Sequence, residues 1–192
     1  MKCLRFIPIL MVFFSSCVYT KITHLDKSEI SWMDAYKVSD TIVFYCGAST
    51  DTMIIVDKVI NNSLFPLSLN EGISEYIANT YFEFFVIHEN ERIEGTFMLE
   101  KVSDDKTTIS TNISNRYGLN IDMKMHEIRM DNMLFKDCII IDNNNSHLNN
   151  KSVLQIEYFV WSKHYGLIEY KISDGMVYRV GGNEIIKRDK PS

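Results

Sequence analysis

The stretch that decides the fold is Leu167–Val180, LIEYKISDGMVYRV. Its turn residues at 173–175, Ser-Asp-Gly, separate two segments in which apolar and polar residues alternate, which is typical of a β-hairpin. A two-residue turn would pair Ile172 with Val177, whereas a three-residue loop with its glycine in the left-handed region would pair Ile172 with Met176. A shift of one residue moves side chains to opposite faces, so only the three-residue loop places all the apolar side chains of the hairpin together. These are Ile168, Tyr170, Ile172, Met176, Tyr178 and Val180.

The same strand pattern recurs along the chain between turn residues. Segments rich in β-branched and aromatic residues are expected to form strands at 41–46, 52–60, 81–88, 92–102, 107–113, 134–142 and 153–161. Helix signals are weaker: residues 71–80 could form two helical turns, although Gly72 weakens them, and residues 121–133 fit either period. The sequence therefore predicts a mostly β fold, an antiparallel twisted sheet or half-barrel with at most one or two short helices.

The N-terminal residues 1–17, MKCLRFIPILMVFFSSC, have the order of a secretory signal. Lys2 and Arg5 give a positive start, and an apolar run follows at 6–14. A helix that spans a bilayer needs about 20 apolar residues, so this run is too short to cross one. Two small serines and then Cys17 end the segment.

The residues Phe14-Ser15-Ser16-Cys17 resemble the lipobox of bacterial lipoproteins, in the looser form found in Bacteroidetes. Phe14 stands where leucine or a similar aliphatic residue is usual. The resemblance implies that residues 1–16 are a signal peptide and that Cys17 carries lipid, with acyl chains such as palmitate. It also implies a cell-envelope location at a membrane, most simply the outer membrane, facing either the periplasm or the outside. The alternative is an ordinary cleaved signal or a buried N-terminal strand, with Cys17 a plain thiol.

Removal of residues 1–16 leaves 176 of the 192 residues, which is the length of one domain. The leader carries two basic residues and no acidic one, so the net charge becomes −7 in place of −5. This charge argues against nucleic acid and against electrostatic binding to anionic lipid. We expect residues 17–40 to hold the lipidated cysteine and a tether, because 18–32 is polar and aperiodic, and residues 41–192 to form a single β-rich domain.

Two further cysteines, Cys46 and Cys138, lie in apolar runs. An exported pair could form a disulfide. The alternative is two buried free thiols, since cysteine behaves as a small hydrophobe. The second interpretation is favoured slightly, because nothing in the sequence places the two strands side by side.

Motifs for nucleotide, metal or catalytic sites are absent from the sequence. Asp142, Asn144 and Ser146 imitate the start of a calcium loop, but His147 stands where its glycine belongs and Val153 where its glutamate belongs. None of the five histidines lies two to five residues from another. We therefore predict neither a cofactor nor a metal site.

The segment 161–170, WSKHYGLIEY, combines aromatic, polar and basic residues before a strand. It resembles the closing hairpin of small β-rich bacterial lipoproteins of uncharacterised role. One interpretation makes Trp161, Lys163, His164 and Tyr165 a ligand-contacting rim. The other packs the two aromatic side chains in the core or at an edge.

Three functions fit the sequence. The favoured one is a non-catalytic, lipid-anchored envelope protein that binds a partner or an envelope component; an apolar concavity would point to a lipid or acyl ligand. The second is an envelope enzyme whose site is assembled from scattered strand residues, with His164, Glu169 and Lys171 as nearest candidates. The third is an accessory subunit of an outer-membrane complex.

Overall fold

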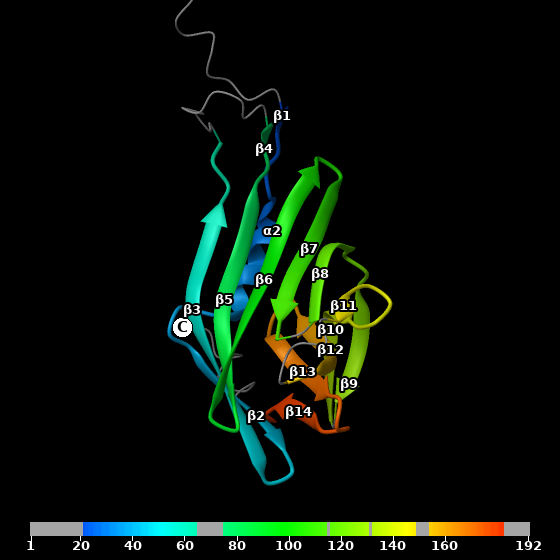
Figure 1. Ribbon diagram of the computed structural model, residues 1–192. Coiled ribbons are helices and arrows are strands. Elements are labelled where there is room, and N and C mark those ends of the chain that lie inside the picture. Colours follow the sequence, from blue (N-terminus) through cyan, green and yellow to red (C-terminus); the bar gives the residue numbers. More distant parts are fainter. Residues whose placement is uncertain (1–20, 65–74, 115, 131, 149–153, 183–192) are drawn as a thin grey trace, which may run out of the picture.

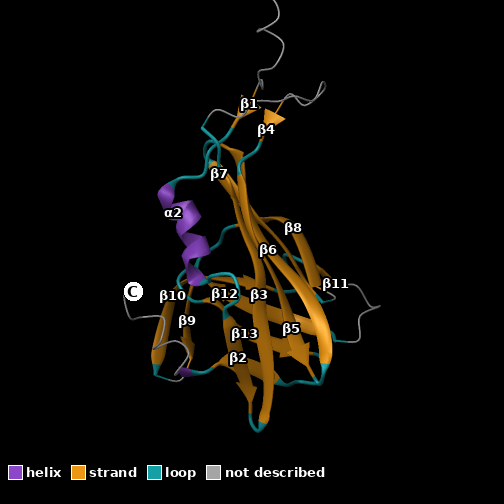
Figure 2. Ribbon diagram, turned by 90° about the vertical axis from the view of Figure 1, so that its left-hand side faces the viewer, coloured by secondary structure: helices purple, strands orange, loops and turns teal. Residues whose placement is uncertain are grey.

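The computed structural model describes residues 21–64, 75–114, 116–130, 132–148 and 154–182. Within these ranges the predicted fold class is confirmed. The chain forms a curled, 12-stranded sheet in which every neighbouring pair is antiparallel, with a small two-stranded sheet at one end. One short α-helix and one 3-10 helix accompany the sheets (Figures 1 and 2).

The strands of the large sheet have the bounds β2 (Thr41–Cys46), β3 (Ser49–Asn61), β5 (Asn79–His88), β6 (Glu91–Ser103), β7 (Lys106–Ile113), β8 (Arg116–Asp122), β9 (His126–Met130), β10 (Met133–Ile141), β11 (His147–Leu148), β12 (Ile156–Ser162), β13 (Gly166–Ile172) and β14 (Val177–Val180). Their spatial order is β11-β8-β7-β6-β5-β3-β2-β14-β13-β12-β10-β9. The small sheet pairs β1 (Lys21–Ile22) in parallel with β4 (Glu75–Tyr76). Helix α2 (Lys27–Ile30) runs into the 3-10 helix Ser31–Ala35.

The large sheet curls so that its two halves face each other. Strands β3, β5, β6 and β7, among which are the longest strands of the sheet, form one wall, and strands β10, β12, β13 and β14 form the other (Figure 1). Trp161 of β12 stacks on Phe97 of β6 across the interior, with ring centroids 4.0 Å apart and planes within 4°. Both side chains are fully buried, so the concave side of the half-barrel is the hydrophobic core.

The closing hairpin has the predicted register. Tyr170 lies opposite Tyr178, and the backbone N–H of Ile172 donates to the carbonyl of Met176 over 3.0 Å. Gly175 adopts φ +94°, which glycine reaches without steric cost. The need to bury one face thus selects the three-residue loop.

The segment before residue 41 is not a tether over the part that the structure describes. Asp26 caps helix α2 through a capping box with Glu29. The following turn buries Trp32, Met33 and Tyr36, each 1 % exposed or less, against the concave face of the sheet. The predicted boundary at residue 41 is therefore wrong, because these apolar side chains anchor residues 21–40 to the core.

An ion pair between buried Lys101 and half-buried Glu29 fixes α2 to β6. The ammonium of Lys101 lies 2.7 Å from Oε1 of Glu29, which also accepts a hydrogen bond from the hydroxyl of Thr107. Burial alone would raise the pKa of Glu29, but these hydrogen bonds, the backbone N–H of Asp26 and the charge of Lys101 together lower it. The helix therefore depends on an ionised glutamate.

One other expectation needs correction, and one stretch that was left open is decided. The helix predicted over residues 71–80 is wrong from residue 75 onward, where the chain forms β4 and the start of β5; residues 71–74 lie outside the described ranges. The ambiguous stretch 121–133 forms the end of β8, strand β9 and the start of β10, so the two-residue period decides it. Strand β8 itself was not predicted, since Gly118 and three polar residues interrupt its pattern.

Candidate functional site

The two aromatic residues of the predicted rim are packing residues. Trp161 is fully buried, and besides Phe97 its indole contacts the ring of Tyr36 edge-on at 5.9 Å. Tyr165 is half-buried and packs edge-on against Phe135, with ring centroids 5.4 Å apart. The rim interpretation is therefore wrong for these two side chains, and the packing interpretation is confirmed.

The two polar residues of the rim lie on the surface and point to different partners. The ammonium of Lys163 donates to the hydroxyl of Ser28 in α2 over 2.7 Å. The side chain of His164 is 64 % exposed, and its Nε2 lies 4.0 Å from a carboxylate oxygen of Asp137. No common ligand surface joins them to the buried indole.

The residues considered for an enzyme also belong to separate contacts. The carboxylate of Glu169 accepts hydrogen bonds from Tyr158 and from Arg179, each over 2.6 Å. Lys171 forms an ion pair with Glu157 over 2.7 Å. These are cross-strand contacts on the outer face of the sheet, and His164 is not among them.

The two cysteines of the body are free thiols. Cys46 is half-buried on β2 and Cys138 is buried on β10. Strands β14, β13 and β12 separate β2 from β10 in the sheet, which excludes a disulfide between them. Burial raises the pKa of the Cys138 thiol to about 11.

The interior of the half-barrel is filled. Phe82, Phe84 and Phe97 project into it from the long strands, and all three pack against the indole of Trp161. An interior hollow bounded by residues such as Val86 measures about 10 Å³. One water molecule needs at least this much room, so the hollow does not hold an acyl chain.

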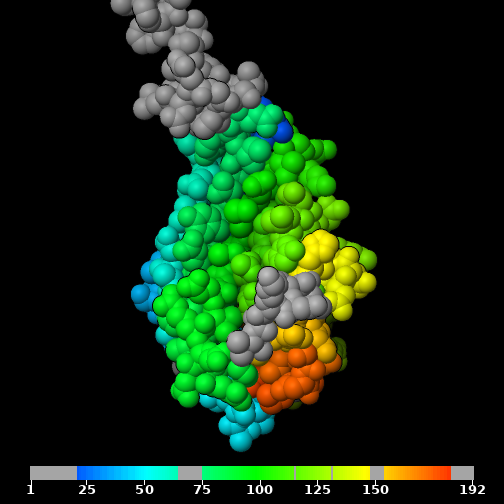
Figure 3. All heavy atoms as spheres, in the orientation of Figure 1, coloured from blue at the N-terminus to red at the C-terminus, as the bar shows by residue number. Residues whose placement is uncertain are grey.

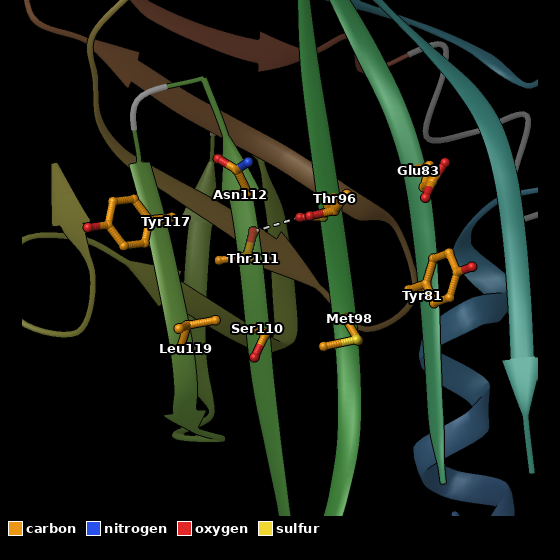
Figure 4. A pocket seen from close by; sticks show the side chains of 9 residues that line it. All are labelled: Tyr81, Glu83, Thr96, Met98, Ser110, Thr111, Asn112, Tyr117 and Leu119. Carbon is orange, nitrogen blue, oxygen red and sulfur yellow. Dashed lines mark hydrogen bonds between the residues drawn. The ribbon is translucent and has the colours of Figure 1, made fainter. Parts of the chain in front are cut away.

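The outer face of the long strands carries an open groove of about 490 Å³ (Figure 4). Nine residues from four neighbouring strands line it: Tyr81 and Glu83 of β5, Thr96 and Met98 of β6, Ser110, Thr111 and Asn112 of β7, and Tyr117 and Leu119 of β8. Its volume lies in the range of small-ligand sites.

Strand register assembles this groove. Met98 lies opposite Tyr81 on one side and Ser110 on the other, and Asn112 lies opposite Tyr117. Small polar side chains and Met98 therefore form the middle, Tyr117 and Leu119 stand at one end, and Tyr81 and Glu83 stand at the other (Figure 4). Leu119 is 71 % exposed and Tyr117 is 41 % exposed, so the β8 side presents apolar surface to solvent.

Sequence reasoning missed this groove because its members come from four different strands. Each strand alone shows only ordinary polar alternation. The groove becomes visible only when β5, β6, β7 and β8 are known to pair in this order, and β8 was not predicted as a strand. The local indication of a binding surface is that Tyr117 and Leu119, two residues apart on β8, are both exposed.

A second polar cluster is buried where β3 begins and β5 ends. Nδ1 of His88 lies 2.9 Å from a carboxylate oxygen of Asp51, and the hydroxyl of Tyr170 donates to the same carboxylate. Burial is the main reason that the pKa of the Tyr170 hydroxyl is raised, and the hydrogen bond to Asp51 raises it further. A histidine oriented by a carboxylate also occurs in hydrolytic triads. Among the described residues, however, no hydroxyl or thiol hydrogen-bonds to Nε2 of His88, so the cluster joins strands β3, β5 and β13 without a nucleophile.

The loop that imitates a calcium site accepts hydrogen bonds from the guanidinium of Arg116. Arg116 of β8 is fully buried and donates to the carbonyl of Ile156 in β12, over 2.9 Å. Its other nitrogens donate to Ser146 over 2.6 Å and to Asn143 over 2.9 Å. The guanidinium thus ties the two walls together, and the described residues include no group of side chains able to hold a metal ion.

The predicted lipidation site, Cys17, lies outside the described residues. In the part of the chain that the structure does describe, no helix has the length and apolar character needed to span a membrane. A comparison of the chain with protein-family models, with curated proteins and with solved structures gives no match.

Proposed function

We propose that this protein is a non-catalytic envelope protein that is attached to a membrane through lipid on Cys17 and binds an envelope component in the groove over β5–β8. The observation that supports binding is the groove itself, which combines an exposed apolar end on β8 with a row of small polar side chains. The attachment half rests on the lipobox-like sequence before Cys17.

The groove is suited to a ligand that offers both apolar faces and hydrogen-bonding groups. The rings of Tyr81 and Tyr117 supply flat apolar surface with a polar tip. The side chains of Ser110 and Asn112 between them, and of Glu83 beside Tyr81, supply hydrogen-bond donors and acceptors. A glycan chain and an extended protein segment both have this mixed chemistry, and the groove is open enough to admit either.

The filled core separates this proposal from a lipid carrier. A carrier needs an interior cavity large enough for an acyl chain, whereas the hollow beside Val86 measures about 10 Å³. Ligand binding on the outer face requires no rearrangement of the core. The outer groove is therefore the better candidate for a binding surface.

Photo-crosslinking in cells tests the proposal. A photoreactive amino acid at residue 119 should give an adduct, because Leu119 stands at the edge of the groove and is 71 % exposed. The matched control is residue 134, since Leu134 is also an exposed strand leucine, 47 % exposed, but lies on β10 outside the groove. Adducts at neither position, or equally at both, would contradict binding in the groove.

The same experiment addresses the accessory-subunit alternative. That version is favoured by the exposed apolar side chains of β8, because a large protein partner would cover them. A single protein adduct of constant mass at residue 119 would support it. A heterogeneous adduct removed by glycan-degrading enzymes would support a glycan ligand.

A further inference from the structure

The end of the molecule at the small sheet carries exposed apolar side chains. Ile22 of β1 is 36 % exposed, Ile60 of β3 is 46 % exposed, and Leu64 just after β3 is 70 % exposed. A surface hollow of about 670 Å³ lies at this end, lined by residues such as Ile60 and Tyr76. We call the three apolar residues and this hollow the end patch.

Hydrogen bonds hold the parts of the end patch together. Ile22 pairs with Tyr76 across the small sheet. The hydroxyl of Tyr76 accepts from the backbone N–H of Ser63 over 2.7 Å, which places Leu64 beside the small sheet. The sheet stands beyond the turn between β6 and β7, so it forms the extremity of the described chain (Figures 1 and 2).

This extremity is also where the chain leads to the proposed anchor. Three residues separate Cys17 from Lys21, the first residue of β1. A fully extended chain covers at most about 3.3–3.6 Å per residue, so lipid on Cys17 lies within about 14 Å of Lys21. A lipid anchor at Cys17 therefore brings the end patch to the bilayer surface.

We propose that Ile60 and Leu64 insert into the interfacial region of the membrane as a second attachment beside the lipid, an inference that rests on the proposed lipidation of Cys17. The occupant of the end patch is thus the bilayer. Residues 17–192 carry a net charge of −7, so the contact is hydrophobic and not electrostatic. Apolar side chains of interfacial segments reach about 5–10 Å into the boundary of headgroups and acyl chains.

Two asparagine side chains that line the hollow of the end patch are already paired, which favours this insertion. The side-chain amide of Asn62 exchanges two hydrogen bonds of 2.9 Å with the backbone of Leu25. The side chain of Asn61 donates to Asn79 over 3.0 Å. Contact with lipid would leave these two amides satisfied, so their desolvation does not oppose the apolar gain.

Fluorescence depth measurement on the full, membrane-purified chain tests the inference. An environment-sensitive fluorescent amino acid replaces Leu64 in one variant and Leu119 in the other, a matched pair because these leucines are 70 % and 71 % exposed. The protein is reconstituted into phosphatidylcholine–phosphatidylglycerol vesicles, with or without bromine on the acyl chains. The probe at residue 64 should shift to shorter wavelength and lose most of its emission to bromine, while the probe at residue 119 should keep its emission.

Mass spectrometry and vesicle flotation of the same samples separate the two proposals. Acyl chains on Cys17 and flotation, without quenching at residue 64, would overturn the membrane contact and leave the proposed function standing. Equal quenching at residues 64 and 119 would also overturn it, because it would show no preferred orientation. An unmodified Cys17 without flotation would refute the lipid anchor, and the end patch would lose its occupant.

Discussion

Replacement of Trp161 by alanine removes the indole that joins the two walls of the half-barrel. The side chain is fully buried. It stacks on Phe97 at 4.0 Å between centroids and packs against Tyr36, Phe82 and Phe84. Its loss opens a cavity between facing strands that cannot approach each other freely, because they belong to one continuous sheet.

The expected cost follows from burial and ring packing. Substitution of a buried tryptophan by alanine usually destabilises a domain by about 3–5 kcal/mol. For a chain of this length, that corresponds to a fall in melting temperature of about 6–20 °C. Since a typical domain has about 5–15 kcal/mol of stability, Trp161→Ala should remove a large part of it. Trp161→Phe keeps a ring against Phe97 and should cost less.

Urea unfolding followed by circular dichroism measures this difference. The matched control is Lys163→Ala, two residues away, which removes a surface hydrogen bond to Ser28 and should cost about 0.5 kcal/mol or less. A loss of stability in Trp161→Ala no larger than that of Lys163→Ala would refute the packing role. The indole would then belong to a surface rim, as the alternative sequence interpretation held.

Three further predictions concern other parts of the core. The pKa of Glu29 is lowered from 4.5, so its stabilising effect is complete above that pH and is lost on acidification through the folded pKa. The difference in urea midpoint between wild type and Glu29→Gln should therefore shrink as the pH falls below 4.5. Gly166 has φ +71° and an added Cβ would lie 2.2 Å from the ring of Tyr36, so Gly166→Ala should lower the melting temperature more than Gly175→Ala, where φ is +94° but the space is open. Burial raises the pKa of Cys138 from 9.0 to about 11, so the folded state retains a proton that the unfolded state loses, and stability should decline across this pH interval. The decline, measured by urea midpoints, should be smaller in Cys138→Ala.

The sequence predicted most strands of the large sheet because each buries one face. Residues 81–88 and 92–102 became β5 and β6, with ends within one residue of prediction at most positions. The register of the closing hairpin followed from the same requirement. Local alternation and turn residues were sufficient for these elements, since neither depends on distant contacts.

Elements that depend on distant contacts were not predicted. Trp32 and Met33 lie in a single helical turn, which is too short to show a helical period in the sequence. They are buried because the sheet curls around them, which no local pattern predicts. Asp51 falls outside the predicted strand 52–60, but β3 already begins at Ser49 and Asp51 is a buried strand residue in contact with His88. The groove over β5–β8 likewise arises from pairing across four strands, which alternation within one strand cannot reveal.

Membrane fractionation of Cys17→Ser tests the central claim of lipid attachment most directly. The wild-type protein should be found in the membrane fraction and should carry acyl chains on Cys17, whereas Cys17→Ser should leave the membrane. The matched control is Cys46→Ser, which alters a half-buried free thiol of the body and should stay with the membrane. A Cys17→Ser protein that remains membrane-bound would contradict the account.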